Sequence, residues 1–238
     1  DSNPHPFSPE TNMNFTWEVV LGDRVLKGDD FTSLLAQRSP LVFFEGKWIV
    51  LDPTEVEKLP DGLPRAGVLT GPEALKAVLT KEHRGIEVAP NSMLEALVDS
   101  LIDPSDQAVP TSLQGTLRSY QRTGYSWLSH LGELGLGACL ADDMGLGKTI
   151  QLIGYLLQRT KVYSHRPHLI VCPTSVIGNW MHELARFAPS LTVAQYHGLE
   201  REIEVATKAN VVLTTYGLLA RDAQLLAAVH WDVLTLDE

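Results

Sequence analysis

The sequence contains only two cysteines, Cys139 and Cys172, among its 238 residues. So few cysteines exclude a disulfide-rich scaffold and a cysteine-based zinc site. Both lie in apolar, strand-like runs, so we expect two small buried side chains in a reducing compartment. Four histidines also lack the spacing of metal ligands, and we interpret them as structural or solvated: His165, His168, His182 and His197.

Long apolar stretches are missing as well. No run reaches the length of a membrane-spanning helix, and the N-terminus lacks the apolar segment of a secretory signal. We therefore expect a soluble, intracellular protein without a membrane partner.

Positive charge is scarce, with 19 Lys and Arg against 29 Asp and Glu, a net charge of −10. The deficit is uneven, because residues 1–110 hold 18 acidic and 9 basic residues whereas residues 111–238 hold 11 and 10. The near-neutral second part can still present a local basic face, since phosphate contacts depend on local potential. The net charge therefore neither supports nor excludes nucleic-acid binding. The acidic first part leaves open that it binds a partner protein.

The segment DDMGLGKT (142–149) follows the apolar run ACLA (138–141) and precedes the apolar-periodic IQLIGYLLQ (150–158). Strand, loop and helix in this order are the context of a phosphate-binding loop. Glycines let backbone N–H groups turn toward phosphate oxygens, the lysine supplies charge for the β- and γ-phosphates, and the threonine offers a hydroxyl to Mg²⁺. The alternative is a glycine-rich turn with a solvated lysine. The predicted nucleotide-binding residues are Asp143, Met144, Gly145, Leu146, Gly147, Lys148 and Thr149.

A second motif, WDVLTLDE (231–238), is a short apolar strand that runs into Asp237 and Glu238. Alone, such a pair is more often a surface turn. Beside a phosphate loop it is typical of a site that holds Mg²⁺ and polarises water. We therefore predict Lys148, Asp237 and Glu238 as catalytic residues, Thr149 and Asp237 as metal ligands, and ATP and Mg²⁺ as cofactors.

The chain divides by composition into four parts. The sequence predicts a disordered end, an accessory α+β region, a Pro- and Ser-rich linker and an α/β domain, at residues 1–14, 15–102, 103–116 and 117–238. In the accessory region we expect a hairpin over 40–52 and helices over 71–83 and 91–102, the second begun by a capping box of Ser92 and Glu95. The last part alternates helix and strand, which implies an α/β fold with a parallel sheet covered on both faces.

Five segments together resemble, in order and spacing, the first RecA-like lobe of Swi/Snf-type ATPases, which are double-stranded-DNA translocases of helicase superfamily two. They are LRSYQRTGYSWL (117–128), ADDMGLGKTIQ (141–151), LIVCPTSVIGNWMHELARF (169–187), VVLTTYGLL (211–219) and VLTLDE (233–238). The resemblance spans about residues 113–238. It departs from the family at Ser119, where proline is common.

The resemblance also implies roles for single residues. Gln121 matches the glutamine that reads adenine, since a carboxamide both donates and accepts. The residues matched to DNA-contacting segments are Pro173, Thr174, Ser175, Asn179, Thr214 and Thr215. Trp180 fits core packing better than a base contact, and Tyr216 fits a structural role equally well.

Two parts of the family's motor are missing from this sequence. One is the strand that inserts between the phosphate-loop strand and the Asp-Glu strand; the other is the second RecA-like lobe, whose arginines stabilise the transferring phosphoryl group. The sequence also lacks an initiator Met. We therefore expect a piece of a longer protein that by itself binds nucleotide poorly and hydrolyses it negligibly.

The resemblance predicts an ATP-dependent double-stranded-DNA translocase. The segment FFEGKWIVLDP (43–53) loosely resembles the region before the motor in some bacterial members, which favours a cytoplasmic, nucleoid-associated protein; a eukaryotic one would be nuclear. Three alternatives stay open: an RNA-dependent helicase of the same superfamily, a protein-interaction module with a vestigial nucleotide site, and a small-molecule P-loop kinase.

Overall fold

A computed structural model of the chain describes residues 7–8, 11–16, 18–21, 24–27, 41–44, 47–50, 66–83, 86–102, 105–163, 165–198 and 201–237. The chain forms two compact units. Unit 1 comprises Asp1–Asp103 with Glu133–Leu136, and unit 2 comprises Pro104–Gly132 with Gly137–Glu238.

Unit 1 is built around the antiparallel strands β1 (Asn12–Thr16) and β6 (Ala66–Thr70), followed by helix α3 (Gly71–Thr80). Phe7 is buried, and the backbone N–H of Gly71 donates to the Thr11 carbonyl at 2.8 Å. Of the end predicted to be disordered, residues 1–14, the structure describes 7–8 and 11–14, in which Phe7 is buried and β1 begins at Asn12; the other residues of this end lie outside the described residues.

Both predicted helices of unit 1 are present, and each has a polar cap. At α3, the Thr70 backbone N–H donates to the Glu73 carboxylate at 2.9 Å. At α4 (Ser92–Ile102), the Asn91 side chain accepts from the Leu94 N–H at 2.9 Å. The capping box predicted at Ser92 is therefore wrong by one residue, because an asparagine in front of it satisfies the same orphan N–H groups.

The other strands among the described residues of unit 1 form three antiparallel pairs. They are β2 (Glu18–Leu21) with β3 (Arg24–Lys27), β4 (Leu41–Phe44) with β5 (Lys47–Val50), and β7 (Glu82–His83) with β8 (Ile86–Glu87). The β4–β5 pair confirms the hairpin strands predicted within 40–52.

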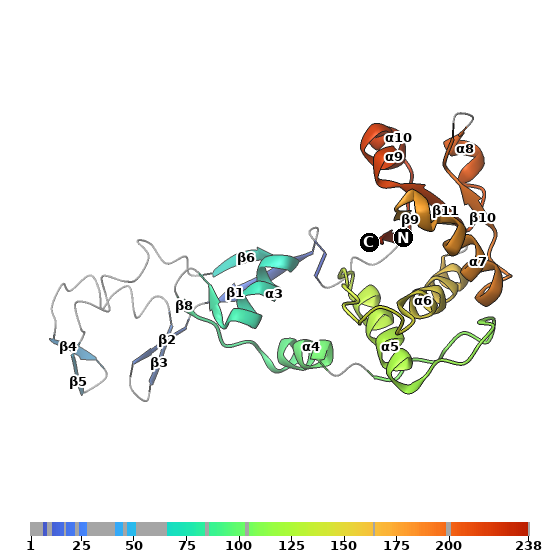
Figure 1. Ribbon diagram of the computed structural model, residues 1–238. Coiled ribbons are helices and arrows are strands. Elements are labelled where there is room, and N and C mark those ends of the chain that lie inside the picture. The colour runs from blue at the N-terminus through green and yellow to red at the C-terminus, as the bar shows by residue number, and fades with distance from the viewer. Residues whose placement is uncertain are drawn as a thin grey trace. The chain divides into compact units, whose positions relative to one another are not determined.

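Unit 2 has a parallel sheet in the order β10-β11-β9-β12. Its strands are β9 (His168–Cys172), β10 (Val193–Gln195), β11 (Val211–Thr215) and β12 (Leu234–Leu236). Its helices are α5 (Ser119–Glu133), α6 (Lys148–Val162), α7 (Ile177–Phe187) after the 3-10 turn η1 (Thr174–Val176), α8 (Ile203–Ala206), α9 (Tyr216–Arg221) and α10 (Ala223–Ala227). Figure 1 labels β9, β10, β11 and the helices α5 to α10.

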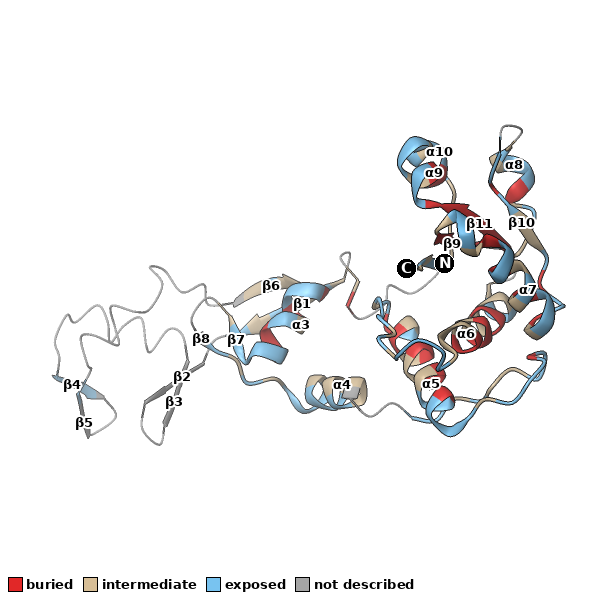
Figure 2. Ribbon diagram, viewed as in Figure 1, coloured by how far each residue is buried: buried red, intermediate tan, exposed pale blue. Residues whose placement is uncertain are grey.

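Strands β9 and β11 are buried along their whole length, because alternate side chains enter two separate cores. Ile170 and Leu213 pack with the apolar residues of α6 and α7. Val171 and Val212 pack on the other face with residues of α8 and α10. Figure 2 shows β11 and much of α6 in the colour of buried residues. The predicted parallel sheet covered on both faces is confirmed.

The run 138–141 is not a strand in the structure. Ala138, Cys139 and Ala141 are exposed, and the sheet ends at β12. The strand predicted before the phosphate loop and the predicted burial of Cys139 are therefore both wrong. An apolar run forms a buried strand only when another strand lies beside it to pair with. Cys172, in β9, is buried as predicted.

Segment 105–116 contains no helix or strand, yet it is fixed to α5. The Tyr125 hydroxyl donates to the Ala108 carbonyl at 3.0 Å, and Arg122 forms an ion pair with Asp106 at 2.7 Å. Among the described helices, none is both long and apolar enough to span a bilayer.

A buried polar cluster joins the end of α6 to the sheet. The Arg159 guanidinium makes two hydrogen bonds with the Asp232 carboxylate, at 2.9 and 2.7 Å, and both side chains are largely buried. The Thr160 hydroxyl and His168 Nε2 lie 2.8 Å apart. Asp232 precedes β12 and His168 begins β9, so the last turn of α6 meets the amino ends of both strands. Helix α6 therefore runs antiparallel to the sheet, and its first residue, Lys148, lies toward the carboxyl ends of the strands.

We predict that the free energy of unfolding decreases as the pH falls, because of His168. Burial lowers the pKa of His168 from 6.5 to about 4. The Asp232 charge opposes this shift, and the Arg159 charge adds to it. Between these values the unfolded chain binds a proton that the folded chain does not, so stability is complete above pH 6.5 and is lost as pH falls toward 4. The loss should approach about 3 kcal/mol, and urea unfolding of wild type and His168→Gln at several pH values measures it. If both proteins show the same slope between pH 6.5 and 4, His168 is not the titrating group.

Candidate functional site

The loop between Asp142 and Lys148 is closed by its own lysine. The Lys148 ammonium donates to the Asp142 carbonyl at 2.7 Å, and Gly145 and Gly147 adopt left-handed φ angles of 84° and 78°. Met144 is 96% exposed. The loop therefore offers an exposed turn of backbone at the start of α6, where N–H groups and the helix dipole favour an anion.

Gln121 holds this loop from the first turn of α5. Its Nε2 donates to the Leu146 carbonyl at 2.9 Å, and its Oε1 accepts from the Arg118 N–H at 2.9 Å. The Tyr120 hydroxyl also donates to Leu146, at 3.1 Å. Both polar atoms of the Gln121 carboxamide are thus engaged within the protein, which places Gln121 at the phosphate loop. Reading of adenine by Gln121 stays a prediction.

Asp237 follows β12 on the same face of the sheet as α6. Its backbone N–H donates to the Val171 carbonyl at 2.9 Å and so extends the pairing with β9. Burial first, and then the nearby Asp237 carboxylate, raise the pKa of the Cys172 thiol in β9. Since Lys148 also lies toward the carboxyl ends of the strands, the loop and Asp237 share one edge and one face. Glu238 lies outside the described residues.

Two side chains donate hydrogen bonds to Asp237. The Trp180 indole N–H donates to Asp237 Oδ2 at 2.7 Å, and the Tyr216 hydroxyl donates to the Asp237 carbonyl. Trp180 is buried in the core of α6 and α7, as its predicted packing role requires. The bond to Asp237 is a role that the sequence did not indicate, because nothing in the spacing of positions 180 and 237 marks them as neighbours.

The residues matched to DNA-contacting segments lie at the carboxyl ends of β9 and β11, except Asn179, which lies in the first turn of α7. Thr174, Ser175 and Asn179 are exposed, and Pro173 is half-buried. Thr214 and Thr215 are buried: the Thr214 hydroxyl donates to the Tyr196 carbonyl at 3.1 Å, and the Thr215 hydroxyl accepts from the Leu218 N–H. A ligand would meet the backbone at the start of α9 rather than these two hydroxyls.

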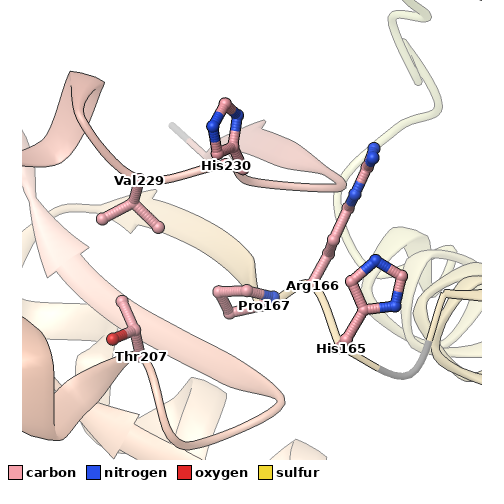
Figure 3. A pocket seen from close by; sticks show the side chains of 6 residues that line it. All are labelled: His165, Arg166, Pro167, Thr207, Val229 and His230. Atoms are coloured by element: carbon pink, nitrogen blue, oxygen red, sulfur yellow. The ribbon is translucent and has the colours of Figure 1, made fainter. Parts of the chain in front are cut away.

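A hollow of about 510 Å³ lies at the opposite edge of the sheet and is shown in Figure 3. It is lined by residues that precede β9, β11 and β12: His165, Arg166, Pro167, Thr207, Val229 and His230. Ligands of parallel α/β sheets bind outside the carboxyl ends of the strands, so this hollow is separate from the candidate site. Among the described residues, no cluster of His, Cys, Asp and Glu is arranged to hold a metal by itself.

We predict that Gly147→Ala destabilises the loop. A Cβ at Gly147 would lie 2.4 Å from Gln121 Nε2, and the residue has a left-handed φ. The expected loss in the free energy of unfolding is about 1–2 kcal/mol, measured by chemical denaturation. Gly137→Ala is the matched control, because a Cβ there meets nothing within 4 Å. Equal stability of the two variants would contradict the proposed packing of Gln121 against the loop.

Two known families match the sequence. The SNF2-related domain matches residues 120–238, and a family described as SNF2 helicase protein matches residues 1–79. The Bacillus subtilis protein YwqA, whose name describes an ATP-dependent helicase/translocase, is 36% identical over 95% of this chain and 27% of its own length. The ATP-dependent helicase brm of Drosophila melanogaster is 35% identical over 78% of this chain and 12% of its own length.

Solved structures of Sulfolobus solfataricus agree in fold. The SWI2/SNF2 ATPase core domain is 41% identical with a TM-score of 0.52, over 57% of this chain and 28% of that chain. The same core in complex with dsDNA is 40% identical with a TM-score of 0.50, over 55% and 28%. The chain thus spans between 12% and 28% of the length of these relatives. The predicted RecA-like lobe is confirmed. Its sequence, its sheet and its phosphate loop together make the chain a member of the Swi/Snf (SNF2) family.

Proposed function

We propose that the full-length protein is an ATPase that uses Mg-ATP to translocate along double-stranded DNA. The observation that carries this proposal is the shared edge of the sheet: α6 runs antiparallel to β9 and β12, so that Lys148 and Asp237 lie at one end of the sheet on one face. In such an arrangement a phosphate-binding loop and a carboxylate can act on the same triphosphate.

The roles in catalysis follow from the chemistry of each group. Lys148 and the loop backbone N–H groups from Asp143 to Gly147 would bind the phosphates. Thr149 and Asp237 supply a hydroxyl and a carboxylate, oxygen donors that fit Mg²⁺ and would hold it. A bound Mg²⁺ would neutralise negative charge on the phosphates. Glu238 would orient the attacking water, a role that rests on the sequence alone.

The proposed DNA contacts lie at the starts of α7 and α9. Thr174, Ser175 and Asn179 are exposed where β9 ends, and N–H groups at a helix start bind a phosphate without reading sequence. The related Sulfolobus solfataricus core is in complex with dsDNA, which supports duplex DNA as the partner. At the start of α9, backbone groups near Thr215 would make the contact.

The remaining partners are proposals from the sequence and the family. We propose residues 15–102 as an accessory region that binds a protein, residues 103–116 as a linker, residues 117–238 as the first motor lobe, and a second RecA-like lobe as its partner in hydrolysis. In a bacterium the protein would act in the cytoplasm, on the nucleoid.

We predict that Lys148→Ala in the full-length protein abolishes DNA-stimulated ATP hydrolysis. The variant loses the charge proposed to bind the β- and γ-phosphates. Helix α6 should still form, because the introduced alanine is the best helix former. A phosphate-release assay measures hydrolysis, and circular dichroism checks the fold. Retained turnover in a folded Lys148→Ala variant would refute the assignment.

Duplex DNA and single-stranded RNA should differ in their effect on the wild-type ATPase. If the protein is a translocase on duplex DNA, duplex DNA should stimulate ATP hydrolysis. This stimulation should weaken as the salt concentration rises, because phosphate contacts release counterions. Hydrolysis assays with each nucleic acid at two salt concentrations test this. Stimulation by RNA alone would favour an RNA-dependent helicase, and no nucleotide binding would favour an interaction module.

A further inference from the structure

Asp237 is held from two helices. Trp180, in α7, donates to one carboxylate oxygen, and Tyr216, the first residue of α9, donates to the backbone carbonyl. Hydrogen bonds from an N–H group to an ionised carboxylate are short and strong, which fits the 2.7 Å distance to Trp180. Within the described part of the chain, Oδ1 accepts no hydrogen bond, so the indole selects which oxygen stays available for a ligand.

Trp180 is well placed to orient this carboxylate. It is 4% exposed and packs in the core with residues of α6, β9 and β11. An indole fixed on all sides cannot follow Asp237 if the carboxylate rotates. The position of Oδ2 therefore depends on the position of α7.

Both donors adjoin the segments proposed to contact DNA. Asn179 is exposed while its neighbour Trp180 is buried, so one turn of α7 has one side toward solvent and the other toward Asp237. Tyr216 follows Thr215, where β11 ends, and is 42% exposed. A ligand that moves or rigidifies the start of either helix acts on Asp237 through one hydrogen bond.

We propose that Trp180 and Tyr216 are positioning residues that couple DNA binding at the starts of α7 and α9 to the Asp237 carboxylate. This inference rests on the proposed function and deepens it. DNA bound at the starts of the two helices would favour one orientation of the Asp237 carboxylate. Mg-ATP bound at the phosphate loop would favour the same orientation. Because such coupling is reciprocal, each ligand must then tighten binding of the other.

The test compares three conservative variants of the full-length protein. Trp180→Phe removes the indole donor and keeps a buried aromatic ring; Tyr216→Phe removes only the hydroxyl. Trp231→Phe is the matched control, because the Trp231 indole donates at the same 2.7 Å, to the Leu226 carbonyl on the other face of the sheet. For each we would measure basal and DNA-stimulated kcat, KM for ATP, the Mg²⁺ concentration of half-maximal rate, and Kd for a DNA duplex with and without a non-hydrolysable ATP analogue.

We expect Trp180→Phe to lower DNA-stimulated kcat at least about tenfold, as for loss of a hydrogen bond to a charged group. Its Mg²⁺ requirement should rise and the analogue's effect on duplex Kd should shrink, while Kd without analogue changes less than about threefold. Tyr216→Phe should shift the same quantities in the same direction. Trp231→Phe should leave the stimulation ratio and the Mg²⁺ requirement as in wild type.

The outcomes separate this inference from the proposed function. If wild type shows no DNA-stimulated hydrolysis, the proposed function itself fails. If wild type is stimulated but Trp180→Phe and Tyr216→Phe behave like Trp231→Phe, only the coupling inference is overturned. If Trp180→Phe does not fold, Tyr216→Phe decides alone, because it removes one hydroxyl oxygen from a side chain that is not buried.

Discussion

The ion pair between Arg159 and Asp232 fixes the polarity of α6 against the sheet. It joins the last turn of the helix to the residue before β12, while Thr160 meets the first residue of β9. Removing one partner of a buried pair leaves the other charge uncompensated, at a cost of about 3–5 kcal/mol. With this pair at the end of α6, the first residue of the helix, Lys148, lies toward the end of the sheet where Asp237 follows β12.

The phosphate loop depends on a second constraint, the Gln121 carboxamide. One carboxamide serves two elements: it caps the start of α5 through Arg118 and holds the Leu146 carbonyl in the loop. Gly147 lets the amide approach the backbone, since any Cβ would occupy its place. Loop and helix α5 are therefore fitted to each other, and a nucleotide base that engaged Gln121 would exchange these bonds for its own.

Much of the lobe could be predicted from sequence because its signals are local. The apolar periodicity of 150–158 predicted a helix where α6 forms, and the alternation of helix and strand in 117–238 predicted the parallel sheet that contains β9 and β11. Phosphate binding by the loop 142–149 stays a prediction. The failures around the sheet concern contacts between distant residues, whereas the capping box predicted at Ser92 missed by one residue for a local reason, the asparagine in front of it. Burial of Cys139 required a strand beside the run 138–141, and burial of Thr214 depends on Tyr196, whose carbonyl takes its hydroxyl.

The sequence by itself determined the family of this protein, and it predicted a phosphate loop and an acidic strand end. These follow from residue type and spacing along a few neighbouring positions. Tertiary structure alone decided which of these groups meet. The bond from Trp180 to Asp237 arises because parallel strands align their carboxyl ends. The pair of Arg159 with Asp232 arises because α6 runs back along the strands and ends at their amino ends, which brings together residues that the chain keeps far apart.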